Sequence, residues 1–412
     1  MMRLLAKTGC SLIFLCFTLT SHSQWISKSN GLNSGVTHCF VETPAGLLSG
    51  GNGDGIFISN DFGDSWTSSN SGIVPGSEIL CFGKHTAGIF AGSDSLIYFS
   101  NNNGASWNIV NNSGYAVFAF ALLNDTVFAA TRGGGVVMST DTGVSWTSTN
   151  TGITTLSVLA IIAKGNLLFA GTENDGIFKS SNSGITWTPV DSGLLMPMDI
   201  RCLETDGMNI YAGTTSFSAS AKGMFISSND GAFWTQVTSG ISPTAFINTI
   251  RSIGNTLLTG ISSDVYRSLD SGASWSGFNN GLPIVGAFGV AAFYATTNYV
   301  FCGIESGIIG SVFRIDKMSV LPVNEIKKEN VTISFYPNPA GKVVTLSLSA
   351  WIKGEIVLSI YDNKGRLVRK GTYLNQGKIE IATHNLPAGL YYFHLESGIH
   401  TATGKLSVQH SP

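Results

Sequence analysis

Residues 59–66 read SNDFGDSW, and this eight-residue pattern returns five more times along the chain. The other copies are SNNNGASW (100–107), STDTGVSW (139–146), SSNSGITW (180–187), SSNDGAFW (227–234) and SLDSGASW (268–275). The shared pattern is Ser-x-Asp/Asn-x-Gly-x-Ser/Thr-Trp, and only the fifth copy departs from it, with Phe233 in place of the hydroxyl residue. A repeat with a period of about 40 residues indicates a propeller or another repeat architecture.

Each copy has the chemistry of a tight hairpin turn. Asp or Asn can hydrogen-bond the nearby backbone, Gly supplies positive φ, and the Trp anchors the turn to a core. The residues that we assign this structural role are Asp61, Asn102, Asp141, Asn182, Asn229 and Asp270. Strand-like phrases before each copy, such as residues 37–42 and 78–83, bring each unit to four strands. The sequence therefore predicts the blades of a β-propeller.

The two ends of the repeat region complement each other. Residues 25–32 (WISKSNGL) match only the last strand of a unit, whereas residues 288–315 supply three strands without a tryptophan motif after them. Joining these ends makes a seventh blade and leaves no open sheet edge. We therefore expect an all-β protein whose residues 24–316 form a seven-bladed propeller, closed between its N- and C-terminal strands.

The composition agrees with this fold class. Glycine accounts for 49 of 412 residues and charged residues for only 12%, as expected for many short strands joined by tight turns. A hydrophobic fraction of 43% excludes disorder, and a net charge of -2 gives no reason to expect a nucleic-acid partner. Four cysteines fall in aligned columns of small residues, and we interpret them as small buried filler rather than disulfides or metal ligands: Cys39, Cys81, Cys202 and Cys302.

Residues 1–23 have the pattern of a secretory signal peptide. Arg3 and Lys7 precede an apolar run from Gly9 to Thr20, and small residues follow at the expected cleavage point. The mature chain is expected to begin near Gln24. No later stretch reaches the ~18 apolar residues of a membrane span, so we expect no transmembrane segment after signal removal.

The last part of the chain reads differently from the repeats. Residues 317–331 contain a proline and a charge cluster, and we interpret them as a linker. Residues 332–412 alternate short strand-like segments with turn signals such as Asn363-Lys364-Gly365. This pattern predicts a small C-terminal β-sandwich.

Both regions resemble known families. The tryptophan motifs resemble the Asp-box (BNR) repeats of sialidase-like propellers, and the whole units are similar to photosystem II assembly-factor propellers and to the propeller halves of xyloglucanases. In those families the Asp box is structural, not catalytic. The segments FYPNPAGKVVTL (335–346), IYDNKGRLV (360–368), LPAGLYYFHL (386–395) and GKLSV (404–408) resemble the type A C-terminal sorting domain of the type IX secretion system.

The second resemblance implies a route and a partner. It implies export through the outer membrane of Bacteroidota by the type IX secretion machinery, often with removal of the tail and attachment to the cell surface. We therefore expect a secreted or surface-attached protein that passes through the periplasm. The matching sorting-signal residues are Tyr336, Pro337, Asn338, Pro339, Gly389, Lys405, Leu406 and Val408.

Candidate binding residues gather on the propeller face opposite the Asp boxes. His38, Arg201 and Asn248 stand at the mouths of innermost strands where the other blades carry apolar residues, and the fifth blade has a longer loop at 214–223. The full candidate set is His38, Arg201, Asn248, Arg132, Glu173 and Asp175. Ordinary solvated loop charges are the alternative interpretation. We find no catalytic residues, no cofactor motif and no metal-ligand spacing.

These features leave three functional hypotheses open. The first is an exported binding or scaffold protein without enzymatic activity, whose ligand is a glycan or an envelope protein. The second is a polysaccharide hydrolase resembling the xyloglucanases, for which a single propeller is a poor match. The third is an assembly factor for other envelope proteins.

Overall fold

The computed structural model separates the chain into two compact units, which divide between Pro322 and Val323. The expected signal peptide (1–23) and residues 322–331 of the expected linker lie outside the described residues. The structure describes residues 24–33, 35–112, 114–215, 223–261, 264–283, 289–305, 311–321, 334–347, 355–364, 366–374, 378–397 and 400–409.

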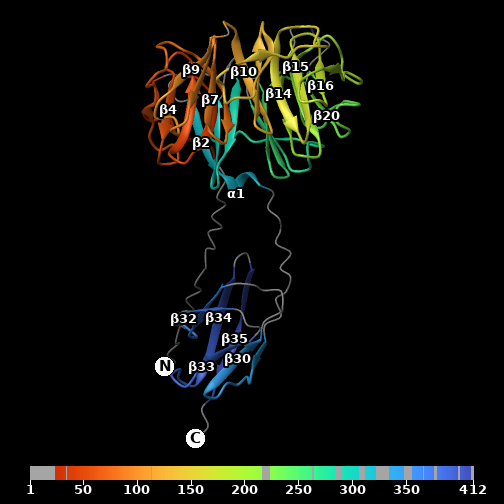
Figure 1. Cartoon of the computed structure of the whole chain (residues 1–412). Coiled ribbons are helices and arrows are strands. Elements are labelled where there is room, and N and C mark those ends of the chain that lie inside the picture. Colours follow the sequence, from red (N-terminus) through yellow and green to blue (C-terminus); the bar gives the residue numbers. More distant parts are fainter. Residues whose placement is uncertain are drawn as a thin grey trace, which may run out of the picture. The chain divides into compact units, whose positions relative to one another are not determined.

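Within the described residues, the first unit contains seven four-stranded antiparallel sheets, so the predicted seven-bladed propeller is confirmed (Figure 1). The first six blades each use four consecutive strands. Blades 1 to 3 comprise β2 (Thr37–Thr43), β3 (Gly46–Gly51), β4 (Ile56–Ser59) and β5 (Thr67–Ser68); β6 (Ile79–His85), β7 (Gly88–Ser93), β8 (Leu96–Ser100) and β9 (Asn108–Asn112); and β10 (Ala116–Leu123), β11 (Thr126–Arg132), β12 (Gly135–Ser139) and β13 (Thr147–Ser148). Blades 4 to 6 comprise β14 (Val158–Lys164), β15 (Leu167–Thr172), β16 (Ile177–Ser180) and β17 (Thr188–Pro189); β18 (Asp199–Thr205), β19 (Ile210–Thr215), β20 (Gly223–Ser227) and β21 (Thr235–Gln236); and β22 (Ile247–Ile253), β23 (Thr256–Ile261), β24 (Val265–Ser268) and β25 (Ser276–Gly277).

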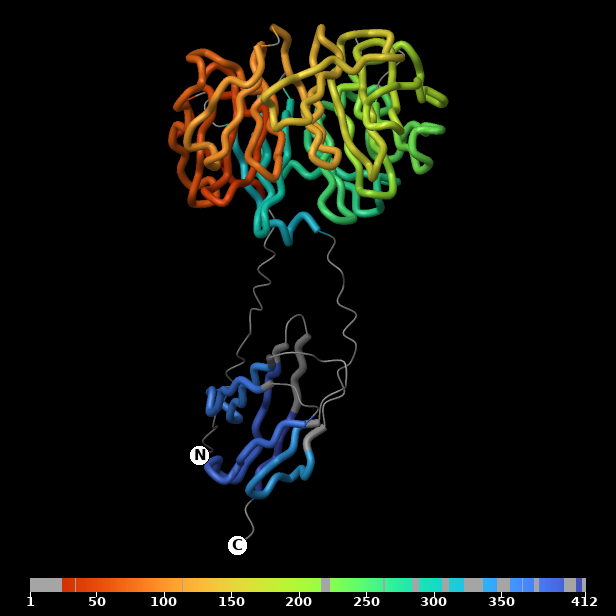
Figure 2. The backbone as a smooth tube through the Cα atoms, in the orientation of Figure 1, coloured from red at the N-terminus to blue at the C-terminus, as the bar shows by residue number. Residues whose placement is uncertain are grey.

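The seventh blade joins the two ends of the ring. It contains β26 (Val290–Ala295), β27 (Tyr299–Ile304), β28 (Val312–Asp316) and β1 (Ile26–Ser27), in which Ile26 pairs with Arg314. Trp25 is buried, and its indole N–H donates to the Phe278 carbonyl at 3.0 Å. The predicted closure between the N- and C-terminal strands is therefore confirmed, and the red and teal ends of the ring meet in Figure 2.

The tryptophan motifs form the turns between the third and fourth strands of six blades. In the first turn the Asp61 carboxylate accepts hydrogen bonds from Ser59 Oγ (2.8 Å), the Ser65 backbone N–H (2.9 Å) and Ser65 Oγ (2.6 Å). Phe62 and Gly63, inside the turn from Asp61 to Asp64, both have positive φ, 58° and 88°, as the central residues of a type I′ turn require. The turn is thus held by its own side chains.

Large and small residues alternate along the innermost strands and pack the ring as wedges. Cys39 lies in a cluster shared by blades 1 and 2, whereas the adjacent Phe40 lies in a cluster shared by blades 7 and 1. Successive residues of a strand point to opposite faces, which explains this division. Cys39, Cys81 and Cys302 are free and buried and Cys202 is free and partly buried, as expected of small residues that fill space between blades.

The propeller unit continues past its last strand. The helix α1 (Lys317–Val320) has Asp316 as its N-cap, and Val320 is fully buried in the same cluster as Trp25. The Arg267 guanidinium donates to the carbonyls of Ser319 (3.0 Å) and Val320 (3.3 Å). Residues 317–320, which we expected in the linker, therefore pack against the seventh blade.

The second unit is the predicted β-sandwich, with two sheets around one core. One sheet contains β29 (Ser334–Tyr336), β30 (Val343–Ser347) and β33 (Lys378–Ala382), and the other contains β32 (Leu367–Leu374), β31 (Glu355–Tyr361), β34 (Gly389–Ser397) and β35 (His400–Val408). Both sheets contribute to the core, for example through Val344, Leu358 and Leu406. The strand β29, whose last two residues begin the FYPNPAGKVVTL segment, was not predicted from the sequence.

The structure brings the two ends of the sorting signal together. Asn338 Oδ1 accepts a hydrogen bond from the Ser407 backbone N–H at 3.0 Å, and Ala340 forms a bridge with Val408. Leu406 and Val408 are buried, whereas Lys405 is exposed and places its ammonium 6.0 Å from the Tyr392 ring centroid. Tyr336, Pro337, Asn338 and Pro339 are exposed, and Gly389 begins β34 opposite Val408.

Candidate functional site in the central cavity

The first strand of every blade has a β-bulge near its start. In blade 1 the pairing between β2 and β3 skips one residue between Thr37 and Cys39, which leaves His38 as the extra residue. A bulge redirects the side chain of the extra residue. The equivalent residues of the other blades are Leu80, Phe118, Leu159, Arg201, Asn248 and Ala291. All seven line one central cavity of about 750 Å³.

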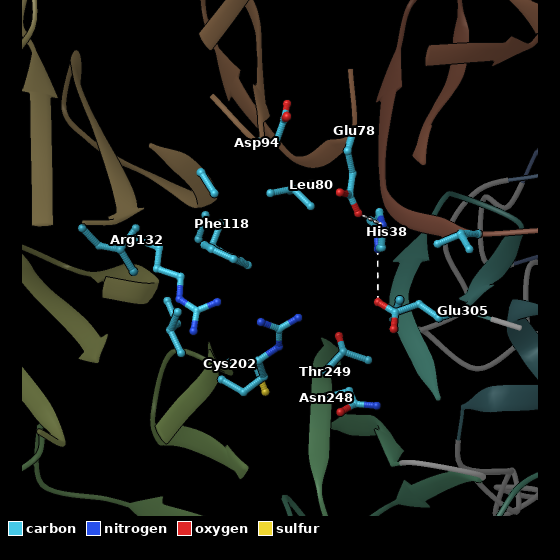
Figure 3. Close-up of a pocket in the computed structure, with 18 of the residues that line it drawn as sticks. His38, Glu78, Leu80, Asp94, Phe118, Arg132, Cys202, Asn248, Thr249 and Glu305 are labelled. Carbon is cyan, nitrogen blue, oxygen red and sulfur yellow. Dashed lines mark hydrogen bonds and ion pairs between the residues drawn. The ribbon is translucent and has the colours of Figure 1, made fainter. Parts of the chain in front are cut away.

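A second repeated position adds charged groups to the same cavity. It is the residue at or just after the end of the second strand of a blade, and it includes Asn52, Asp94, Arg132, Glu173 and Glu305. All of these except Glu173 line the cavity. Figure 3 shows Asp94, Arg132 and Glu305 around the same space. Much of the chemistry of the cavity therefore comes from two positions that the fold repeats and the sequence varies, and Glu78, just before β6, adds a further carboxylate.

His38 bridges two carboxylates across three blades. Its Nε2 lies 2.9 Å from Glu78 Oε1, and its Nδ1 lies 3.1 Å from Glu305 Oε1 (Figure 3). An ionised carboxylate only accepts hydrogen bonds, so a ring nitrogen of His38 that carries a hydrogen donates to the carboxylate that it faces. The hydrogen bond from His38 holds the pKa of Glu305 below its usual range. The three side chains thus form a clamp that links blades 7, 1 and 2.

Arg132 is held in place by a carboxylate of the next blade. Its Nη2 and Nε donate to Glu173 Oε1 (2.5 Å) and Oε2 (3.1 Å), and the Ser157 hydroxyl donates to the same carboxylate at 2.6 Å. These hydrogen bonds, first those from Arg132, lower the pKa of Glu173. The charge of Arg132 is therefore largely balanced within the protein.

Arg201 has a different environment. Its guanidinium lies 5.4 Å from the centroid of the Phe118 ring, which belongs to a blade two places away. Among the described residues, none places a carboxylate within ion-pair distance of Arg201. Asn248 lies beside Thr249 on the wall of the cavity (Figure 3). An exposed guanidinium above an aromatic face can still use its N–H edge to bind a ligand.

The candidate residues from the sequence do not all meet. His38, Arg132, Arg201 and Asn248 line the cavity together, and Glu173 takes part through Arg132. Asp175 accepts a hydrogen bond from the Thr154 hydroxyl and is not among the residues that line the cavity. Most of the long loop of blade 5, residues 216–222, lies outside the described residues. All these site assignments remain predictions.

Two partners of His38 were not predicted from the sequence. Glu78 and Glu305 come from other blades, so nothing near His38 in the sequence joins them to the histidine. The apolar wall of the cavity, formed by Leu80, Phe118 and Leu159, was not predicted as part of the site either. The sequence does carry a signal for the cavity wall. It is the residue just before the aligned small residue of each innermost strand, such as His38 before Cys39.

The described residues contain no group of three or more His, Cys, Asp and Glu side chains that could hold a metal ion. Of the helices in those residues, none combines the length and the apolar composition needed to cross a bilayer.

Comparison with known families identifies the second unit. Residues 334–409 match the family described as the secretion system C-terminal sorting domain. The chain is therefore a β-propeller protein with a type IX sorting domain, the mark of a secreted, cell-surface or extracellular protein. No curated protein matches the chain.

The propeller is similar to several solved structures at low identity. The extracellular domain of a hybrid two-component system from B. thetaiotaomicron is 15% identical, with a TM-score of 0.57 over 86% of this chain and 47% of that one. YCF48 from Cyanidioschyzon merolae is 12% identical (TM-score 0.54; 71% of this chain, 98% of that one). A GH74 xyloglucanase from Xanthomonas campestris is also 12% identical (TM-score 0.54; 93% and 75%).

These similarities establish the fold alone. The chain spans about half the length of the B. thetaiotaomicron extracellular domain that it matches. The neighbours include the extracellular domain of a two-component system and a xyloglucanase, so the shared propeller is compatible with different functions.

Proposed function

We propose that this protein is an exported binding protein that captures a glycan in the central cavity of its propeller, outside the cell. One observation carries the proposal: the two repeated positions that face the cavity hold different polar and apolar groups in nearly every blade, whereas the turns at the other end repeat one motif. A concave site with an apolar wall and a few fixed polar groups is typical of ligand binding. The sorting domain supports an extracellular ligand.

The cavity has suitable groups for a sugar. Leu80, Phe118 and Leu159 offer apolar surface to the C–H face of a pyranose ring, while Asn52 and Asn248 offer amide groups to its hydroxyls. The clamp of His38, Glu78 and Glu305 keeps carboxylate oxygens at defined places. A binding site needs such fixed groups because ordering them on binding would reduce affinity.

The electrostatics favour binding over hydrolysis. A glycosidase needs one carboxyl group that stays protonated at working pH through a raised pKa. In this cavity the hydrogen bond from His38 lowers the pKa of Glu305. The ionised form of this carboxyl group is therefore favoured, which suits it to accept hydrogen bonds from ligand hydroxyls.

The experiment uses the mature chain, residues 24–412, against a panel of polysaccharides, glycoproteins and envelope proteins. It records both retention and released products. We expect retention of at least one glycan without products, and weaker retention by His38→Ala. Val144→Ser, an exposed change in an Asp-box turn, is the control and should bind like the wild type. Released sugars would contradict the proposal and show that the protein is a hydrolase. Retention of proteins alone would contradict it as well and favour a role in assembly.

The proposed export route has its own test. Removing residues 405–412 deletes the end of β35, including the buried Leu406 and Val408. We expect the truncated protein to accumulate in the periplasm, whereas the full chain reaches the surface. Lys405→Ala, which leaves the core intact, shows whether the exposed end of the signal is read directly. Normal surface display of the truncated chain would contradict the assignment of these residues to the sorting signal.

A further inference from the structure

The acidic and the basic side chains that line the cavity come from different blades. Glu78, Asp94 and Glu305 come from blades 2 and 7, while the two guanidinium groups of Arg132 and Arg201 come from blades 3 and 5. Figure 3 shows Arg132 across the cavity from Glu305. A ligand that fills this space therefore meets carboxylates on one side and guanidinium groups on the other.

The two arginines of the cavity differ in the partners that their guanidinium groups already have. Arg132 already has a bidentate carboxylate partner in Glu173. Arg201 lies over the Phe118 ring and has no carboxylate within ion-pair distance among the described residues. The planar fork of a guanidinium matches a carboxylate with two parallel hydrogen bonds. Arg201 is thus the group in the cavity best placed to bind one external carboxylate.

The opposite side limits how much negative charge the ligand can carry. Glu78 and Glu305 both contact the same histidine, His38, and Asp94 adds a third acidic side chain on this side. A polyanion such as a heavily sulfated chain would be repelled by this side. The same carboxylates can accept hydrogen bonds from uncharged hydroxyl groups. The ligand that fits is one carboxylate on a body rich in hydroxyls.

We propose that the cavity binds an acidic glycan through a single uronic acid residue, with the sugar carboxylate on Arg201 and sugar hydroxyls on the Glu78 and Asp94 side. This inference rests on the proposed glycan-binding function and narrows it to one class of sugar. The Arg201 guanidinium lies over the Phe118 ring, and both residues line the cavity.

The test measures binding of the mature chain to short oligomers of galacturonate, mannuronate and glucuronate-containing sugars by calorimetry. Each is paired with its methyl ester, which removes the charge and keeps the hydroxyls. We expect at least one acid to bind about 10-fold to 100-fold more tightly than its ester, the usual range for a charge-assisted pair. Arg201→Ala should abolish this difference, and Arg201→Lys should restore only part of it.

Controls separate this inference from the proposed function. Val144→Ser should keep the preference for the acid, and melting curves confirm that the Arg201 variants fold. Equal affinity for acids, esters and neutral glycans would overturn the inference and leave glycan binding intact. Binding of peptides through a free C-terminal carboxylate, with no glycan bound, would overturn both, and so would the failure of every sugar to bind.

Discussion

The two ends of each blade follow opposite rules. At one end, six turns repeat the Asp-box pattern with the same hydrogen bonds: the hydroxyl of the first Ser donates to the Asp or Asn side chain in all six. At the other end, the bulge residue is His, Leu, Phe, Leu, Arg, Asn or Ala. Repetition marks what every blade needs in order to fold, and variation marks what the ring uses only once. This contrast is why we place the function at the cavity.

The Asp-box end also shows why Asp and Asn interchange there. In the first turn, Asp61 Oδ2 accepts from the Ser65 hydroxyl at 2.6 Å. In the second turn, Asn102 Nδ2 donates to the Ser106 hydroxyl at 2.8 Å, so the hydroxyl reverses its role. In both turns the Oδ1 atom accepts a hydrogen bond from the backbone N–H four residues later, that of Ser65 or Ser106. The turn therefore depends on hydrogen bonding, not on a negative charge.

The largest expected effect lies at the Asp-box end and concerns stability. Trp66 is buried, and its indole N–H donates to the Lys28 carbonyl of the neighbouring blade at 2.7 Å. Trp66→Ala should lower the free energy of unfolding by about 3–5 kcal/mol, as expected for a buried aromatic residue. Chemical denaturation of the mature chain measures this change.

Trp146 is the matched control for Trp66. It occupies the same place in its motif, but it is only partly buried, and its indole N–H donates to Gly143 within its own turn. Trp146→Ala should therefore destabilise the protein less than Trp66→Ala. Equal losses would contradict the view that the tryptophans act by packing blades together.

The substitution His38→Ala tests the cavity end of the blades, and its expected effect on stability is intermediate. The change removes the imidazole between Glu78 and Glu305, which should cost about 1–2 kcal/mol because two partly exposed side-chain hydrogen bonds are lost. It should also weaken glycan retention, unlike Trp66→Ala at temperatures where that variant stays folded. Unchanged stability and unchanged glycan retention would contradict the role proposed for the clamp.

The pH dependence of this clamp has a defined sign. The pKa of Glu305 is lowered in the folded protein, so its contribution to stability is present above the usual glutamate range and is lost as the pH falls through the lowered value. The difference in unfolding free energy between the wild type and Glu305→Gln should therefore shrink as the solution is acidified below about pH 4. Melting curves from pH 7 to pH 3 measure it, and a constant difference would contradict the assignment.

The smallest expected effect is at Asp61. Hydrogen bonds from Ser65, first that of its side chain, lower the pKa of Asp61 to about 2, so its contribution is present near neutral pH and is lost as the pH falls toward that value. Asp61→Asn should change the stability at pH 7 by no more than about 0.5 kcal/mol, since three natural turns already use Asn. A large loss at pH 7 would show that the charge itself matters.

The fold could be predicted because its signals are local. The turn at 59–66 contains its own hydrogen-bonding partners, and a period of about 40 residues repeats it. Ring closure followed because residues 25–32 match the strand that the last blade lacks. The clamp could not be predicted in the same way, because His38 and Glu305 lie 267 positions apart and meet only once the ring has closed. Arg201 was recognised as unusual, but its contact with Phe118 depends on the bulges of two separate blades.

The central claim is that ligand binds at the varied end of the blades. Hydrogen–deuterium exchange of the mature chain, with and without the best-retained uronate oligosaccharide, tests it most directly. The account predicts slower exchange in the segments that carry His38, Phe118, Arg201 and Asn248, and unchanged exchange in the Asp-box turns. Slower exchange confined to the turns at 59–66 and their repeats would place the site at the wrong end of the propeller and contradict the account.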